Sequence, residues 1–376
     1  MSTQPPAQPP EIFFPPINSD WHAHATKRFA GPFVGVNFDR VDVDPILLPY
    51  AAIQAGYGLK EFYQNPKLGL ASVCWANEMH DLLPVAHWFY SNVWMRELGC
   101  KLRYSDTLPP IVDAPRPVQS PEDAEKLAVV DVSGIEKGPT FAEFATGYDF
   151  LKQYLPNWLV PIHFGFCPTA MAAELVGVDK FMLWTIKQPK LCHKLMQTVV
   201  DTSANAAIAI AKRYGFAMMV IGGVLANSDL LAPAKVKEFG LDYHIRLVKA
   251  AFKGGAGPQL WYHLCGNHSK DYQIWKDEIM SPFTVMHIGY MGKESFPVKL
   301  AKELYGNRAT IMSSLDTKLM YRGKPKEVYD VSKQMILDGK DSPRGFVHGC
   351  ACECPAFAPP ANVYAMVKAA REWGKF

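Results

Sequence analysis

Residues 217–264 read AMMVIGGVLANSDLLAPAKVKEFGLDYHIRLVKAAFKGGAGPQLWYHL and contain one complete strand–helix–strand unit. The short apolar runs 217–222 and 259–264 are typical of buried strands. Between them, residues 233–252 follow a helical pattern that a proline opens in its first turn. Two strands joined by a helix are parallel neighbours in one sheet.

The same alternation continues along the chain. Further strands are predicted at 158–164, 283–288, 309–313 and 345–348, and further helices at 169–184, 189–214, 297–304, 325–338 and 360–373. So many units predict an α/β fold of the (β/α)₈ TIM-barrel type. A doubly wound open sheet is the alternative, but no G-x-G-x-x-G follows a strand, which weakens a dinucleotide-binding interpretation.

Composition excludes several classes of protein. The 376 residues carry a formal net charge of +3 with no dense Lys/Arg run, which argues against nucleic-acid binding. No apolar run reaches the ~18–20 residues of a membrane helix, and residues 1–16 lack the pattern of a secretory signal. We expect a cytoplasmic protein with a disordered or loosely docked tail at 1–16 and a single domain at 17–376. The first part of that domain is an irregular extension expected to decorate the barrel mouth.

The segment WYHLCGNHS, residues 261–269, places His263 and Cys265 two positions apart. On a strand this spacing directs an imidazole and a thiol to the same face. Gly266 is expected to end the strand. Active sites of TIM barrels lie at the C-terminal ends of the strands.

A second cluster, HGCACECP at 348–355, follows another predicted strand. It contains Cys350, Cys352 and Cys354 at spacings of two. One histidine and two cysteines favour zinc, and three protein ligands leave a fourth position open for catalysis. A thiol bound there would be held as a nucleophilic thiolate. The spacing alone leaves open a closed structural metal site, a redox site and ordinary core packing.

Four blocks, at 165–201, 262–267, 313–330 and 349–374, resemble the uroporphyrinogen decarboxylase superfamily in the same order. The resemblance covers most of residues 40–376. It implies a distorted (β/α)₈ barrel. The H-x-C motif with a later cysteine resembles the zinc-dependent branch, which alkylates thiols. By this resemblance His263 and Cys265 are zinc ligands. The third is Cys352, counted ten residues back from Asn362, with Cys350 of the Gly-Cys dipeptide as the alternative.

That branch includes two activities that fit the sequence. The first is epoxyalkane:coenzyme M transferase, a lyase-type reaction in which a zinc-bound coenzyme M thiolate opens an epoxide. The alternative is methyl transfer from a methylated corrinoid protein to coenzyme M or another thiol. The long Pro-rich leader before residues 39–43, and Gly222-Gly223 in place of an acidic pair, depart from the methyltransferase pattern and favour a small free electrophile. A homo-oligomer is compatible with either activity.

The remaining site residues follow from the chemistry of the first activity. The alkoxide formed on epoxide opening needs an acid, and the candidates are His287, Tyr262 and His268. The sulfonate of coenzyme M needs a cationic partner, for which Arg116, Arg246 and Lys318 are candidates. A non-enzymatic zinc-binding module is disfavoured by the open coordination position. Porphyrinogen decarboxylation is disfavoured because it needs no metal.

Overall fold

A computed structural model describes residues 18–33, 38–88, 90, 93–154, 162–164 and 167–376. The predicted tail at 1–16 lies outside these residues. No helix in the described part of the chain is both long and apolar enough to cross a membrane.

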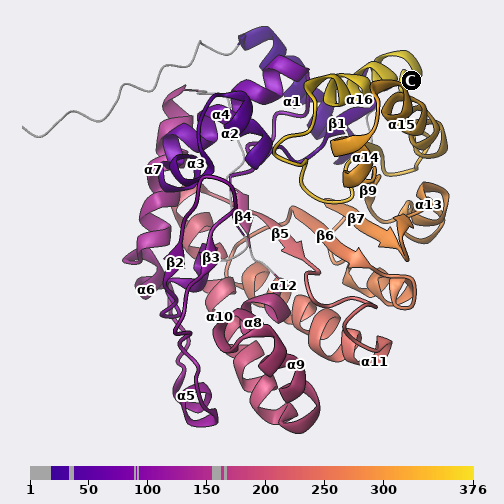
Figure 1. Ribbon diagram of the computed structural model, residues 1–376. Helices are drawn as coiled ribbons and strands as arrows, with labels where there is room; N and C mark the ends of the chain where they lie inside the picture. Colours follow the sequence, from indigo (N-terminus) through magenta and orange to yellow (C-terminus); the bar gives the residue numbers. More distant parts are fainter. Residues whose placement is uncertain (1–17, 34–37, 89, 91–92, 155–161, 165–166) are drawn as a thin grey trace, which may run out of the picture.

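The centre of the molecule is a mostly parallel sheet surrounded by helices (Figure 1). Its strands follow the order β1, β10, β9, β7, β6, β5, β4, and β8 pairs antiparallel with β7. The strands are β1 (Asp42–Asp44), β4 (Ile162–Phe164), β5 (Met218–Gly222), β6 (Leu260–Asn267), β7 (Thr284–Met291), β8 (Glu294–Ser295), β9 (Thr310–Met312) and β10 (Phe346–Gly349). The α/β prediction is confirmed. The fold is consistent with a TIM-type barrel, although ladder hydrogen bonds among the described strands do not close the ring between β1 and β4.

The helices of the second half agree closely with the sequence pattern. They are α8 (Pro168–Val176), α9 (Val178–Lys187), α10 (Pro189–Tyr214), α11 (Pro233–Val236), α12 (Asp242–Lys253), α13 (Val298–Tyr305), α14 (Thr317–Arg322), α15 (Pro325–Gly339) and α16 (Pro360–Trp373). A π-helical turn, Lys237–Leu241, joins α11 to α12, and a 3₁₀ segment, Tyr272–Glu278, follows β6. The helix predicted at 169–184 is two helices, because Gly177 has a φ of +105° that a continuous helix does not allow.

The first half contributes more than the decoration expected of it. Its elements are α1 (Ser19–Phe33), α2 (Pro49–Gln54), α3 (Leu59–Gln64), α4 (Pro66–His80), the 3₁₀ turn Val93–Met95, the hairpin of β2 (Leu102–Arg103) and β3 (Ile111–Val112), α5 (Pro121–Lys126), α6 (Val132–Glu136) and α7 (Pro139–Tyr154). Strand β1 pairs with β10 in the main sheet. The extended residues 82–88 run beside β1, where the Leu83 N–H donates to the Val43 carbonyl at 3.0 Å. These segments are too short to show a strand periodicity in the sequence.

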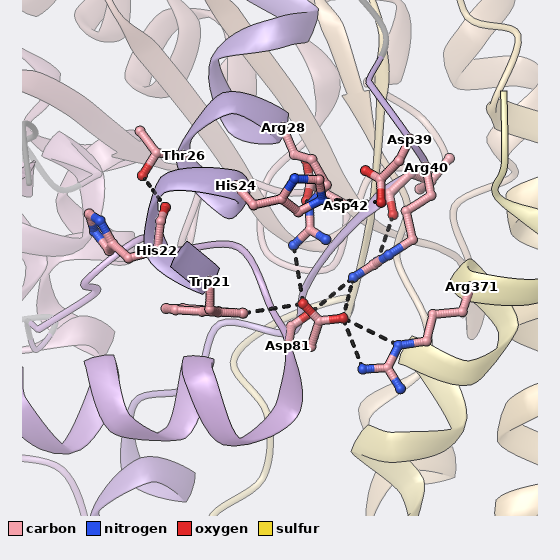
Figure 2. A network of polar contacts seen from close by, with 11 residues as sticks. Trp21, His22, His24, Thr26, Arg28, Asp39, Arg40, Asp42, Asp81 and Arg371 are labelled. Carbon is pink, nitrogen blue, oxygen red and sulfur yellow. Dashed lines mark hydrogen bonds and ion pairs between the residues drawn. The ribbon is translucent and has the colours of Figure 1, made fainter. Parts of the chain in front are cut away.

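A polar cluster ties the start of β1 to α1, α4 and α16 (Figure 2). The Asp81 carboxylate, just after α4, accepts hydrogen bonds from Arg40 at 2.6 Å and Arg371 at 2.9 Å, and from the Trp21 indole at 3.2 Å. Arg28 lies 3.5 Å from the same carboxylate and pairs with buried Asp42 at 2.9 Å. Burial opposes the ionisation of Asp81, but Arg40 and the other guanidinium groups outweigh it and lower its pKa. The cluster therefore anchors the N-terminal helix to the barrel.

Candidate metal centre

Strand β6 brings His263 and Cys265 to one face, as their spacing predicts. The His263 Nε2 atom lies 2.6 Å from the Cys265 Sγ atom. Contrary to expectation, Gly266 does not end the strand. With a φ of +88° it forms part of a bulge, after which Asn267 pairs with Tyr290 of β7. The two candidate ligands therefore lie next to an irregularity in the ladder, at the C-terminal side of the sheet.

The loop after β10 supplies the third member of the cluster. The Cys352 Sγ atom lies 3.7 Å from Cys265 Sγ, and the potential ligand atoms of His263, Cys265 and Cys352 all lie within 4.8 Å of one another. Each of the three residues is half-buried. One imidazole nitrogen and two sulfurs at this separation fit the ligand set of a zinc ion with a further position open.

The other two cysteines of the cluster point elsewhere. Cys350 is fully buried, with its Sγ atom 4.0 Å from the Met366 sulfur, and Cys354 is buried with its Sγ 3.9 Å from the Pro355 carbonyl. The geometry thus groups Cys352, and not Cys350, with His263 and Cys265.

The two neighbouring thiols differ in acidity. The hydrogen bond from Cys265 lowers the pKa of Cys352 well below its usual value, whereas the same contact and burial raise the pKa of Cys265. One of the two thiols therefore loses its proton before the other, and a bound cation would favour loss of the second proton.

A cavity of about 170 Å³ opens against this cluster. Its described lining is Ile46, Tyr63, His87, Tyr90, Pro109, Val220, Gly222, Val224, Trp261, His263, Cys265, Cys352 and Glu353. Burial and the adjacent Cys352 raise the pKa of Glu353 to about 8. Because most of the lining side chains are apolar or aromatic, a substrate bound to the metal would lie in a mostly apolar pocket.

Three residues that line or support the cavity were not predicted from the sequence. The His87 Nε2 atom bonds to the Asp44 carboxylate at 2.9 Å, and the His87 ring packs edge-on against Trp261. Glu353 stands between two cysteines of the CECP motif, so a carboxylate beside candidate ligands was the available signal. Asp44 closes β1, a strand too short to be predicted, and had no such signal. His87 lies in an extended segment with no sequence signature.

The three predicted general acids are not among the described residues that line the cavity. His287 is buried on β7, with its Nδ1 atom 2.8 Å from His263 Nδ1. Tyr262 is buried and follows the opposite alternation to His263 along β6. His268 is buried and bonds to Asp271 at 2.7 Å and to the Cys265 carbonyl at 3.1 Å. His287 and His268 are thus placed to support the cluster.

The three predicted sulfonate partners are also absent from the described cavity lining. Arg116 pairs with Glu174 at 2.5 Å. Arg246 bonds to Gln197 at 3.0 Å and stacks on Tyr243. Lys318 lines a separate surface pocket with Tyr321. The sequence could not separate these cations from others, because surface ion pairs leave no pattern in it.

Comparison with known proteins agrees with this architecture. Residues 25–373 match the family model "Uroporphyrinogen decarboxylase (URO-D)". A methylated-thiol–coenzyme M methyltransferase of Methanosarcina mazei is 27% identical over 282 residues, covering 73% of this chain and 68% of the relative. A methylcobamide:CoM methyltransferase of Methanosarcina barkeri is 26% identical over 209 residues, covering 55% of this chain and only 56% of that relative.

A solved structure described as a methyltransferase from Methanosarcina mazei superposes with a TM-score of 0.74 at 21% identity, covering 93% of this chain and 98% of the other. At that identity the likeness concerns the fold. The fold, the order of the sequence blocks and the match over residues 25–373 agree, and the chain belongs to the uroporphyrinogen decarboxylase (URO-D) family.

Proposed function

We propose that this protein is a zinc-dependent methyltransferase that moves a methyl group from a methylated corrinoid protein to a thiol. The observation that carries the proposal is the convergence of His263, Cys265 and Cys352 within 4.8 Å at a cavity. The names of the two methanogen relatives support methyl transfer. They do not support the epoxide-opening activity that we expected first, so the alternative takes its place.

The reaction requires a thiolate and a place to hold it. Zinc, when bound, favours the thiolate form of a coordinated thiol. His263, Cys265 and Cys352 would hold the ion, and the cavity walls would orient the rest of the thiol. The new bond joins the thiol sulfur to the methyl carbon. The cobalt–carbon bond of the corrinoid breaks with its electron pair left on cobalt, and the thiol proton is released.

His287 is a positioning residue for this centre. The His263 Nε2 atom faces the sulfurs, so its Nδ1 atom, 2.8 Å from His287 Nδ1, must share one proton with that partner. Burial, together with His263, lowers the pKa of His287 well below its usual value, which keeps it neutral and able to accept. We assign the proton to His263 Nδ1, because this tautomer leaves Nε2 free to bind a metal.

His287→Ala is therefore expected to weaken zinc binding about 10- to 100-fold, since a lost partner lets the His263 ring turn. Competition with a chromogenic chelator measures the affinity. His348→Ala is the matched control, because His348 is equally buried on β10 but bonds to Ser313 at 2.7 Å. Equal zinc affinity in the two variants would remove the positioning role.

The proposed function is tested on the purified protein. Metal analysis is expected to find a single zinc ion per chain. Incubation with methylcobalamin and a thiol should give the methyl thioether and reduced cobalamin, whereas incubation with epoxypropane should give no hydroxyalkyl thioether. An iron–sulfur spectrum, or thioether formed from the epoxide without a corrinoid, would contradict the proposal.

A further inference from the structure

The cavity beside the proposed centre has a defined chemical character. Along β6, Trp261 shares the face of His263 and Cys265, two and four positions away. Its neighbour in register on β5 is Val220, and that of His263 is Gly222. Val220 and Trp261 therefore form a hydrophobic layer next to the cluster, toward the N-terminal ends of the strands.

Aromatic rings from the first half of the chain form another wall. Tyr63 of α3 and Tyr90 line the cavity and contact each other edge to face, with centroids 5.7 Å apart and planes at 86°. With Trp261 they bring three π systems to one pocket. The faces of aromatic rings attract cations, and proteins bind methylated ammonium groups in pockets lined by several such rings.

The charged side chains around the cavity do not favour an anion. Every lysine and arginine of the sequence lies within the described residues, and none lines the cavity. Glu353 is the one carboxylic acid among the described lining residues. An anionic group buried here would have no lysine or arginine to pair with, which is unfavourable in an apolar pocket.

From these contacts we infer that the cavity binds a small methylated cation, so that the thiol methylated at this centre carries an onium tail, a quaternary ammonium or sulfonium group. The inference deepens the proposed function and rests on it for the role of the thiol. The volume suffices, because the cavity of about 170 Å³ is larger than the ~150 Å³ cavity that encloses benzene in an engineered protein. The inferred tail differs in charge from coenzyme M, the thiol in the relatives' names.

Three thiols with the same two-carbon spacer test the charge preference. They are thiocholine, its uncharged tert-butyl analogue, and coenzyme M. With the zinc-loaded protein and methylcobalamin, we expect the KM of thiocholine to be about 10-fold below that of the uncharged analogue. Coenzyme M should be the weakest substrate. An uncharged analogue as good as thiocholine, or a lower KM for coenzyme M, would overturn the inference.

A binding measurement separates this inference from the proposed function. Choline, its uncharged tert-butyl analogue and isethionate are the alcohols that correspond to the three thiols, and calorimetry measures their binding without methyl transfer. If choline binds most tightly but the protein transfers no methyl group, the proposed function is wrong and the cation subsite is supported. If the protein transfers a methyl group but binds isethionate more tightly than choline, the proposed function is supported and the cation subsite is wrong.

Tyr63 offers matched variants. Tyr63→Phe keeps the ring face, and it should keep the preference for choline over the uncharged analogue. Tyr63→Leu removes the π system and should reduce that preference several-fold, because it weakens the binding of choline more than that of the uncharged analogue. Zinc content and thermal unfolding of both variants control for folding. If Tyr63→Leu retains the full preference in a folded, zinc-loaded protein, the aromatic subsite is wrong.

Discussion

Cys352→Ala is expected to abolish zinc binding and methyl transfer, while Cys350→Ala keeps both. Cys352 Sγ lies 3.7 Å from Cys265 Sγ, whereas Cys350 Sγ lies against Met366 in the core. Loss of a direct ligand should weaken zinc binding beyond the ~10- to 100-fold typical of an outer-shell partner. Metal analysis after dialysis and the methylcobalamin assay measure the two effects.

Cys350→Ala is the control for this pair of variants. The side chain is fully buried, so its truncation leaves a small cavity, which we expect to destabilise the fold by about 1 kcal/mol without displacing zinc. Zinc lost from Cys350→Ala but retained by Cys352→Ala would reverse the assignment. Zinc retained by both would mean that neighbouring thiols replace one another.

Asp81→Ala is expected to produce the largest loss of stability, about 2–3 kcal/mol, because it leaves Arg28 and Arg40 buried next to each other without this anion. The estimate lies below that for a fully buried pair because the Asp81 side chain is 23% exposed. The shift of the urea midpoint at constant slope measures the change. Asp81→Asn, which keeps the shape, should lose most of the same amount.

The pH dependence provides an independent check. The pKa of Asp81 is lowered in the folded state, so its contribution is fully present above about pH 4, the unfolded value, and is lost as the pH falls through the folded value. The difference in stability between the wild type and Asp81→Ala should therefore shrink in acid.

Arg371→Ala is the control variant. The Arg371 side chain is 47% exposed, and its loss should change the stability by less than about 1 kcal/mol. An Asp81→Ala variant as stable as Arg371→Ala would show that the cluster does not anchor α1.

The order of strands and helices from residue 189 onward was predictable because each element is long enough to show its own period. Helices α10 and α16 begin and end where the pattern predicts, at Pro189–Tyr214 and Pro360–Trp373. The short strand β1 was not predictable, because its three residues become a strand only through hydrogen bonds to β10. The single helix predicted across Gly177 and the strand end predicted at Gly266 were wrong, since a glycine marks a conformational freedom without saying how the chain uses it.

The metal centre likewise has a part that the sequence predicts and a part that it does not. His263 and Cys265 share a strand, and the period of two is a local rule, so the sequence by itself determined that they face one side. It also determined the α/β class and, through the order of its blocks, the family. The family resemblance preferred Cys352 to Cys350, and the tertiary structure decided between them by placing Cys352 next to the other two ligands. Only the tertiary structure placed His287 behind His263 and brought Tyr63, Tyr90 and Glu353 around one cavity. Those distances depend on how distant segments pack, and packing is a property of the whole fold that no local period encodes.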